Sequence, residues 1–180
     1  MRDTSVTYVI LGMLRLGPRS GYDVKQFVDN STRFFWAASY GQIYPELRRL
    51  LEAGLIEAEA ETPDGRRRKV YRLTAAGEQA LHDWLVAPVE PSYELRDESL
   101  LKLFFADALT TEEALEIVRA MRRRHATVVE RLRAIAPEAQ SAPVRFPHVV
   151  LQGGLALHGR VVDWCDELER DLQADDRERA

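Results

Sequence analysis

The residues with the clearest chemical potential form the polar face of a helix predicted over about 40–53. Its apolar side chains gather on one side, so the opposite, outward side consists of Gly41, Gln42, Pro45, Arg48 and Arg49. A glutamine amide can pair with adenine, and an arginine can pair with guanine or with phosphate. Glycine and proline keep this face slim enough to approach a major groove. The helix is therefore a candidate reader of DNA sequence.

Other residues around this helix are candidate DNA contacts, each with a structural alternative. Tyr40 and Tyr44 lie at the edge of the face, where their hydroxyls can reach phosphate; the alternative is that both are core aromatics. Ser39 begins the helix, and in a capping box Gln42 would bind the Ser39 backbone instead of a base. Lys25, on the preceding helix, is a candidate contact to the DNA backbone.

A second basic group lies on a predicted turn. Residues 63–72 contain five basic residues and one acidic residue, and four of the basic ones are consecutive: Arg66, Arg67, Arg68 and Lys69. Such a cluster on a hairpin would contact phosphate or enter a minor groove, which gives affinity rather than sequence choice. A run of charge can also be a plain solvated surface. Four acidic residues weigh against DNA contact nearby: Glu46, expected on the outward arc of the helix, and Glu57, Glu59 and Glu61.

Three predicted helices precede this hairpin. The first covers Val6 to Leu14 and stops at Gly17-Pro18, and the second opens with a capping box of Ser20 and Asp23. A box of the same spacing opens the third helix, the candidate reader. Gly54 is expected to end it, because glycine accepts the positive φ of a helix C-terminus at low cost.

The chain order then becomes that of a winged helix. Alternating apolar and acidic residues predict a strand over 56–61, and the turn at 62–65 leads into a returning strand over 68–73. Thr74 caps a fourth helix. We therefore expect a mainly α protein in which residues 1–87 form a winged helix-turn-helix with a two-stranded β wing.

The second half of the chain is predicted to be all-α. Pro88 and Pro91 mark a linker over 88–94, which precedes a helical dimerisation domain over 95–175 and a tail over 176–180 that we expect to be disordered. One helix begins at Asp97 and is so apolar that it must be covered on several sides. The next begins at Thr110 and is expected to close at Pro137.

The last predicted helix, about 146–172, indicates a homodimer. It is apolar around too much of its circumference to sit on the surface of a monomer, because two adjacent apolar stripes cannot both face one core. The predicted dimer contacts are Leu151, Leu155, Leu157, Val161, Trp164 and Leu168. Gly153 and Gly154 weaken the helix, which makes sense where two helices approach each other. A two-fold dimer would present two reading helices to a palindromic site.

Composition excludes several other classes of protein. The 180 residues carry a net charge of −4, but the two halves divide it as +1 and −5, so the acidity belongs to the helical half. The single cysteine, Cys165, rules out an intramolecular disulfide and fits a reducing, cytoplasmic setting. No zinc-type spacing is present, so no metal or cofactor is expected, and no apolar run is long enough to enter a membrane.

An enzyme is not expected, and a small-molecule effector is left open. The four histidines, at 82, 125, 148 and 158, are scattered in sequence and have no Ser/His/Asp or glycine-rich phosphate motif beside them. His158, Asp163, Cys165 and Glu167 point in different directions on one helix, which disfavours a metal sensor. An effector pocket between the two halves would use the aromatic residues Phe34, Phe35, Trp36 and Trp84.

Several of these segments together resemble the PadR family of bacterial regulators. The resemblance lies in residues 39–56 (SYGQIYPELRRLLEAGLI), in Tyr71 to Thr74 with Gly77, and in Gly21-Tyr22. It continues through 95–106 (LRDESLLKLFFA) and 154–168, and so covers nearly the whole chain.

The resemblance implies a homodimeric repressor that binds an inverted-repeat operator on double-stranded DNA and that a small molecule, often aromatic or phenolic, releases. By analogy the third helix reads the sequence and the wing positions it. The alternative is a dimeric interaction module, derived from such a regulator, that no longer binds DNA; the acidic strand and the negative net charge favour this alternative.

Overall fold

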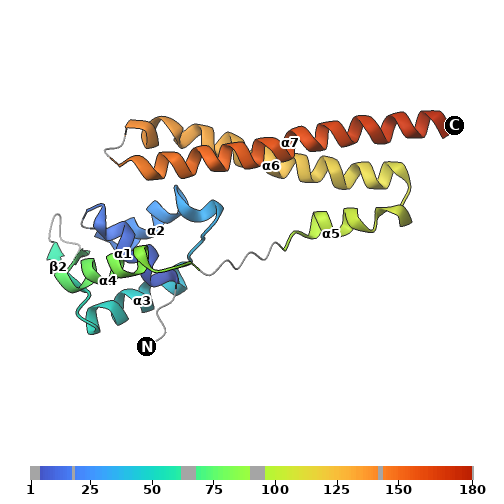
Figure 1. Cartoon of the computed structure of the whole chain (residues 1–180). Coiled ribbons are helices and arrows are strands. Elements are labelled where there is room, and N and C mark those ends of the chain that lie inside the picture. The colour runs from blue at the N-terminus through green and yellow to red at the C-terminus, as the bar shows by residue number, and fades with distance from the viewer. Residues whose placement is uncertain (1–4, 18, 62–67, 90–95, 142–143, 180) are drawn as a thin grey trace. The chain divides into compact units, whose positions relative to one another are not determined.

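The computed structural model describes residues 5–17, 19–61, 68–89, 96–141 and 144–179. The chain divides into two compact units, Met1–Pro91 and Ser92–Ala180 (Figure 1). This division falls inside the linker predicted over 88–94.

The first unit contains four helices and a small sheet in the order expected for a winged helix. Its helices are α1 (Ser5–Arg15), α2 (Gly21–Asp29), α3 (Tyr40–Glu52) and α4 (Ala75–Val86), with a 3₁₀ turn over Thr32–Phe34 between α2 and α3. The core between the helices is made of aliphatic side chains that are almost fully buried: Ile10, Leu11, Val24, Val28, Ile43, Leu47 and Leu50. This packing confirms that the apolar side of α3 faces inward.

The helix boundaries follow the capping signals in the sequence. Ser20 and Asp23 form a capping box at α2, and Ser39 and Gln42 form one at α3. The Thr74 hydroxyl accepts a hydrogen bond from the backbone N–H of Gly77 at the start of α4. All three predicted helix starts are confirmed.

The sheet has one strand more than expected. Strands β2 (Ile56–Glu61) and β3 (Arg68–Leu73) form the antiparallel wing, and β1 (Arg19–Ser20) pairs with the other edge of β3, giving the order β1-β3-β2. In β1, Arg19 lies opposite Tyr71. A strand of two residues is too short to show the alternation by which strands are recognised in a sequence. The predicted two-stranded wing is thus part of a three-stranded sheet.

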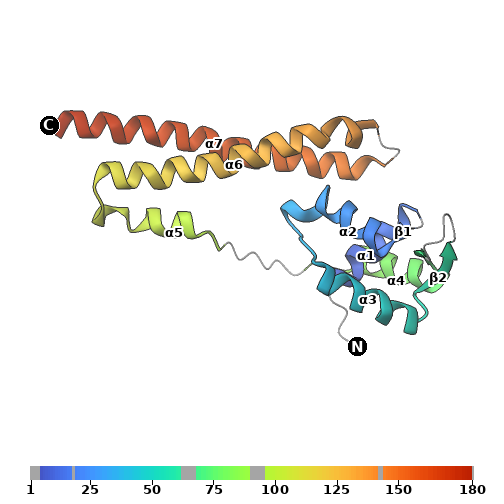
Figure 2. The same ribbon diagram turned by 180° about the vertical axis from the view of Figure 1, so that it is seen from behind.

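The second unit is all-α, as predicted. It contains α5 (Glu98–Phe104), a 3₁₀ turn over Ala106–Ala108, and two long helices, α6 (Thr111–Ser141) and α7 (Arg145–Arg179). Figures 1 and 2 show α6 and α7 side by side as an antiparallel hairpin, with α5 packed on α6. The centre of the hairpin is a buried cluster of Val118, Met121 and Cys165.

Two predicted boundaries in this unit were wrong. Helix α6 does not close at Pro137 but continues to Ser141. Pro137 is exposed, so the carbonyl that loses its N–H partner there can be satisfied by water. Helix α7 extends to Arg179, and the tail predicted for 176–180 is therefore helical up to that residue. The last turns contain no glycine or proline that would stop the helix.

Candidate nucleic-acid interface

Helix α3 presents a continuous polar face on the winged-helix unit. Its exposed residues are Gly41, Gln42, Tyr44, Pro45 and Arg48, which we call the α3 polar face. On the opposite side, Ile43 and Leu50 are completely buried. The separation follows from the helical period, which places residues 41, 45 and 48 on one side. The face predicted from the sequence is therefore present, with the exception of Arg49.

Arg49 does not point outward as predicted, because it is held by Glu46. Its Nη2 lies 2.6 Å from Glu46 Oε1, and its Nε donates to the same carboxylate at 3.0 and 3.1 Å. Nη2 also donates to the Thr7 hydroxyl on α1 at 3.0 Å. Glu46 is buried with only 9% of its surface exposed, so its predicted place on the outward arc was also wrong. This pair ties α3 to α1.

The charge state of this pair follows from its hydrogen bonds. The bond from Arg49 lowers the pKa of Glu46 below its usual value, and a bond from Thr7 acts in the same direction. Burial opposes both effects, because a partly desolvated carboxylate is costlier to ionise. Since the pKa of Glu46 is lowered on balance, the pair is ionic at neutral pH and Arg49 is engaged within the protein.

Lys25 and Tyr40 extend the α3 polar face towards α2. The Lys25 ammonium lies 5.4 Å from the centre of the Tyr40 ring and also pairs with Asp29 one turn further along α2. The Tyr40 and Tyr44 rings stack with their centres 6.1 Å apart. Both tyrosines are more than 40% exposed, so the alternative that they are buried core aromatics does not hold.

Gly21 explains how α2 approaches this face so closely. A Cβ atom at position 21 would lie 2.8 Å from Cε1 of Tyr44, closer than real Cβ atoms come to a neighbour. A side chain there would push the Tyr44 ring away from α2. The sequence contained this signal as part of the Gly21-Tyr22 resemblance, but the contact that requires glycine becomes visible only in the fold.

The capping alternative for Gln42 is present in the structure. Its Oε1 accepts hydrogen bonds from the Ser39 backbone N–H at 2.9 Å and from the Ser39 hydroxyl at 3.0 Å. The cap uses the oxygen of the amide and leaves its Nε2 group out of these bonds. Contact between Gln42 and a base therefore stays a prediction.

Only part of the basic wing lies among the described residues. Arg66 and Arg67 lie outside them, and Arg68 is placed only as a backbone position of β3, opposite Glu61. Lys69 is exposed. Arg72 pairs with Glu59 across the strands at 3.5 Å, which offsets part of the acidity of β2.

Tyr71 on the wing lies within electrostatic range of the α3 polar face, and the sequence reasoning missed this. It lies on β3 and is 8% exposed, and burial raises the pKa of its hydroxyl. Tyr44 raises this pKa further while Arg48 lowers it, so both α3 side chains act electrostatically on the Tyr71 hydroxyl. Tyr71 was part of the family resemblance, but no local pattern indicated its neighbours on α3.

The four aromatic residues proposed for an effector differ in their surroundings. Phe35 and Trp36 are 63% and 45% exposed, and Phe34 is half-buried in the 3₁₀ turn. Trp84 on α4 stacks face to face on Tyr8 of α1, with ring centres 4.5 Å apart. Phe35 and Trp36 thus offer apolar surface, whereas one face of Trp84 is already occupied.

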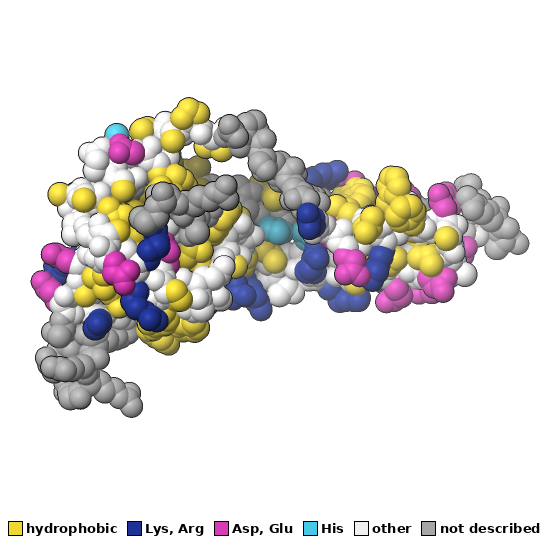
Figure 3. All heavy atoms as spheres, turned by 90° about the horizontal axis from the view of Figure 1, so that it is seen from below, with side chains coloured by type: hydrophobic (Ala, Val, Ile, Leu, Met, Phe, Trp, Pro, Cys, Tyr) yellow, Lys and Arg dark blue, Asp and Glu magenta, His cyan; other side chains and the backbone are white. Residues whose placement is uncertain are grey.

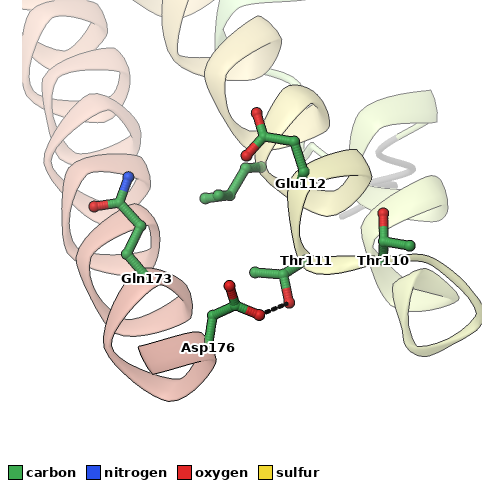
Figure 4. Close-up of a pocket in the computed structure, with 6 residues that line it drawn as sticks. Thr110, Thr111, Glu112, Gln173 and Asp176 are labelled. Atoms are coloured by element: carbon green, nitrogen blue, oxygen red, sulfur yellow. Dashed lines mark hydrogen bonds between the residues drawn. The ribbon is translucent and has the colours of Figure 1, made fainter. Parts of the chain in front are cut away.

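The helical unit contains a pocket whose lining is mostly polar, unlike the aromatic residues proposed for an effector. Figure 4 shows it between the start of α6 and the last turns of α7, where the Thr111 hydroxyl donates to Asp176 at 3.1 Å. Its lining is mostly polar: Thr110, Thr111, Glu112, Leu115, Gln173 and Asp176. None of the described residues that line it is aromatic, so it does not match the predicted aromatic effector site.

The predicted dimer residues of α7 divide into three that pack inside the chain's own hairpin and three that lie nearer the start of the helix. Val161, Trp164 and Leu168 pack against Val118 and Met121 of α6, within the chain's own hairpin. The sequence could not show that this stripe has a partner in the same chain. Leu151 is buried and Leu155 half-buried, whereas Leu157 is 64% exposed. Gly154 approaches α6 as well, since a Cβ there would lie 3.2 Å from Leu132 Cδ1.

Apolar surface remains exposed elsewhere in the helical unit. The most exposed large side chains are Leu101, Phe104 and Phe105 in and after α5, and Phe146, Val149, Val150 and Leu157 on the first half of α7. Figure 3 shows hydrophobic side chains gathered on the surface of this unit. The expectation that the α5 segment is covered on several sides is not met within one chain.

Two of the four histidines, which are far apart in the sequence, lie next to each other in the fold. His125 on α6 and His158 on α7 meet with their Nδ1 atoms 2.9 Å apart. Among the described residues, no group of three or more His, Cys, Asp or Glu side chains is placed to hold a metal ion. None of the described helices is long and apolar enough to cross a membrane.

These features define a winged-helix protein with a helical second unit, the architecture of a DNA-binding regulator. Residues 10–83 match the family described as "Transcriptional regulator PadR-like family", and residues 95–173 match "Virulence activator alpha C-term". The negative transcriptional regulator PadR of Bacillus subtilis (strain 168) is 34% identical over 171 residues, which cover 89% of this chain and 93% of that protein. The chain belongs to the PadR-like family of transcriptional regulators, which are DNA-binding proteins and not enzymes.

Two crystal structures of Bacillus subtilis PadR are similar to this chain. The complex with operator DNA has a TM-score of 0.85 at 29% identity and covers 94% of this chain and 99% of that one. The complex with p-coumaric acid has a TM-score of 0.78 at 28% identity and covers 96% and 99%. The likeness confirms the mainly helical, winged-helix fold class.

Proposed function

We propose that this protein is a homodimeric repressor that binds an inverted-repeat operator on double-stranded DNA. In this proposal the α3 polar face enters the major groove, and the wing contacts phosphate or the minor groove through Arg66, Arg67, Arg68 and Lys69. The repressor role is supported by the Bacillus relative, whose name describes a negative transcriptional regulator. We place the protein in the cytoplasm, where bacterial DNA lies.

The observation that carries the proposal is the exposure of Arg48 on a face that is otherwise slim. Gly41 and Pro45 on the same face carry no long side chain, so a groove wall can approach the helix backbone. Arg48 is exposed, whereas its neighbour Arg49 is held by Glu46. One arginine is thus available to pair with guanine or phosphate, and the other stabilises the scaffold that presents it.

Lys25, Tyr40 and Tyr44 support contact with the DNA backbone beside that groove. The cation of Lys25 over the Tyr40 ring and the stacked tyrosines form a patch with one positive charge and two exposed phenol groups. Phosphate contacts of this kind fix the register of a protein on the duplex without choosing a sequence. The ion pair with Asp29 lowers the net charge that Lys25 offers, so we assign it a smaller share of the affinity.

A second copy of the chain is the partner that we propose for the exposed apolar surface of the helical unit. Phe104 and Phe146 are 79% and 74% exposed, and Leu157 is 64% exposed. Exposed apolar surface of this kind commonly marks a protein interface. A two-fold pair would bury it and bring two α3 helices to the two halves of a palindromic operator.

We also propose that an aromatic molecule, such as a phenolic acid, acts as effector and releases the operator. The proposal is supported by the relative that was crystallised with p-coumaric acid. In this chain the candidate contacts are Phe34, Phe35, Trp36 and Trp84, of which Phe35 is the most exposed and Trp84 already stacks one ring face on Tyr8. Quenching of tryptophan fluorescence by a panel of phenolic acids tests this, with Trp36→Phe as the variant that should lose most of the signal.

The repressor proposal is tested by recovering the DNA that the protein selects from the genome and footprinting it. We expect an inverted repeat whose half-sites are separated by about 10 base pairs, or a multiple of this, so that both lie on one side of the duplex. Expression of the neighbouring gene should rise when the regulator is deleted. Selection of no sequence by a well-folded dimer would support instead the module that no longer binds DNA.

A further inference from the structure

Two histidines form a hydrogen bond between the two long helices of the hairpin. The proposed DNA-binding function does not use this pair. His125 lies on α6 and His158 on α7, with their Nδ1 atoms 2.9 Å apart and their ring centres 4.9 Å apart. Both side chains are half-buried. A distance of this length between two ring nitrogens is that of a hydrogen bond, in which one Nδ1 donates its hydrogen and the other accepts it.

Such a bond restricts how many protons the two rings can hold. A neutral pair has one hydrogen between the two Nδ1 atoms, and a pair with one added proton still has a donor facing an acceptor. When both rings are protonated, each Nδ1 carries a hydrogen and each ring carries a positive charge. The bond is then lost, and the two rings repel each other. The contact between α6 and α7 at this point is therefore lost when the second ring is protonated.

The surroundings of the pair link it to the start of α5. Asp97 caps α5 by accepting a hydrogen bond from the Ser99 N–H at 2.8 Å, and its other oxygen pairs with Arg124 of α6. Arg124 disfavours a positive charge on both histidines, whereas Asp97 favours one on His125. The charged groups that act on the pair thus come from α5 and α6, while α7 contributes His158 itself.

The pKa values of both histidines are lowered from their usual range. Burial is the main cause for each, and repulsion from His158 adds to it for His125. A lowered pKa in the folded state means that the unfolded chain takes up protons first as the pH falls. The stability that the pair provides is complete above the unfolded value of about 6.5 and is lost as the pH falls through the folded values.

We propose that the His125–His158 pair is a proton-sensitive latch that joins α6 to α7 and opens on acidification. It is closed while the pair holds at most one added proton and opens when both imidazoles are charged. If the helical unit is the dimerisation half, which rests on the proposed function, opening the latch also weakens the dimer and its hold on the operator.

The latch is tested on the full-length protein by NMR titration of the histidine ring nitrogens between pH 8 and pH 5. Two imidazole nitrogens at this distance could share a divalent metal ion, so the buffers contain a chelator. The expected result is two coupled titration steps for His125 and His158, both below the pKa of a free histidine. Independent titration of the two rings, each as in a free histidine, overturns the proposal. This experiment needs no substitution.

Thermal unfolding at pH 7.5 and 5.5 provides the second test. The wild type should lose more of its Tm on acidification than His125→Gln or His158→Gln, because each variant removes the second charge. His82→Gln, at an exposed position on α4 of the other unit, is the matched control and should lose as much as the wild type. Hydrogen exchange, corrected for its intrinsic pH dependence, should show the loss of protection around residues 125 and 158. An equal loss of Tm in the wild type and in a variant that carries both His125→Gln and His158→Gln also overturns the proposal.

Discussion

The guanidinium of Arg49 lies 2.6 Å from the carboxylate of Glu46, and this contact gives two neighbouring arginines of α3 different roles. Arg49 bridges Glu46 and Thr7 and so holds α3 against α1. Arg48, one residue earlier, is exposed on the α3 polar face. The helix is therefore anchored by one arginine and presents the other to a partner.

Arg49→Ala should destabilise the winged-helix unit by about 1–3 kcal/mol, because it leaves the buried Glu46 carboxylate without its main partner. Arg48→Ala is the matched control and should change the free energy of unfolding by less than about 0.5 kcal/mol. Urea unfolding followed by circular dichroism measures both. Equal stability of the two variants would show that the Glu46–Arg49 pair does not anchor the helix.

The same pair predicts a specific acid sensitivity of the unit. Because Arg49 lowers the pKa of Glu46, the stability that this carboxylate provides is complete above its unfolded value of about 4.5 and is lost as the pH falls through the lower folded value. The difference in unfolding free energy between the wild type and Glu46→Gln should shrink as the pH is lowered from 7 to 3. Taking this difference cancels the titration of other carboxylates that both proteins share. A difference that stays constant would contradict the ionic pair.

Gly77 tests the junction between the wing and α4. A Cβ at this position would lie 2.0 Å from the backbone oxygen of Leu55, so Gly77→Ala must displace α4 from the start of β2. We expect a loss of about 2–3 kcal/mol in unfolding free energy. Gly12→Ala is the control in the same unit, since a Cβ there meets no atom within 4 Å and should stabilise helix α1 by about 0.5–1 kcal/mol. Similar changes in unfolding free energy for the two variants would show that Gly77 does not pack closely against the backbone of Leu55.

The dimer prediction concerns the exposed apolar surface of the helical unit. Phe104→Asp and Leu157→Asp should each weaken self-association by about tenfold or more, because a charge would be buried against apolar surface. Light scattering coupled to size-exclusion chromatography, over a range of concentrations, measures the mass. Gln152→Asp adds the same charge to α7 at another exposed position. If this control dissociates the dimer as strongly, total charge and not the apolar surface controls assembly.

The elements of the winged-helix unit could be predicted because their signals are local. The boxes at Ser20 and Ser39 and the cap at Thr74 mark helix starts within four residues of sequence, and Gly54 ends α3 with a φ of +68°. The alternation over 56–61 is likewise visible without any partner strand. Each of these signals depends on neighbours in the chain, so no knowledge of the fold was needed.

The features that were missed depend on partners distant in sequence. Periodicity placed Glu46 on an outward arc, but α1 covers that side of α3 and supplies Thr7 as a partner. His125 and His158 are 33 residues apart and meet only because α6 and α7 fold back on each other. The same fold-back gives Trp164 an apolar partner in its own chain. No pattern within one helix indicates which side another element will cover.

Binding to labelled DNA tests most directly whether Arg48 and the α3 polar face choose a DNA sequence, as we propose. Fluorescence anisotropy would compare the selected operator with a random duplex of equal length over a series of salt concentrations. The wild type should prefer the operator and lose affinity steeply with salt. Arg48→Ala should weaken operator binding by about 10- to 100-fold and random-duplex binding by less. Unchanged preference for the operator in folded Arg48→Ala would contradict the account.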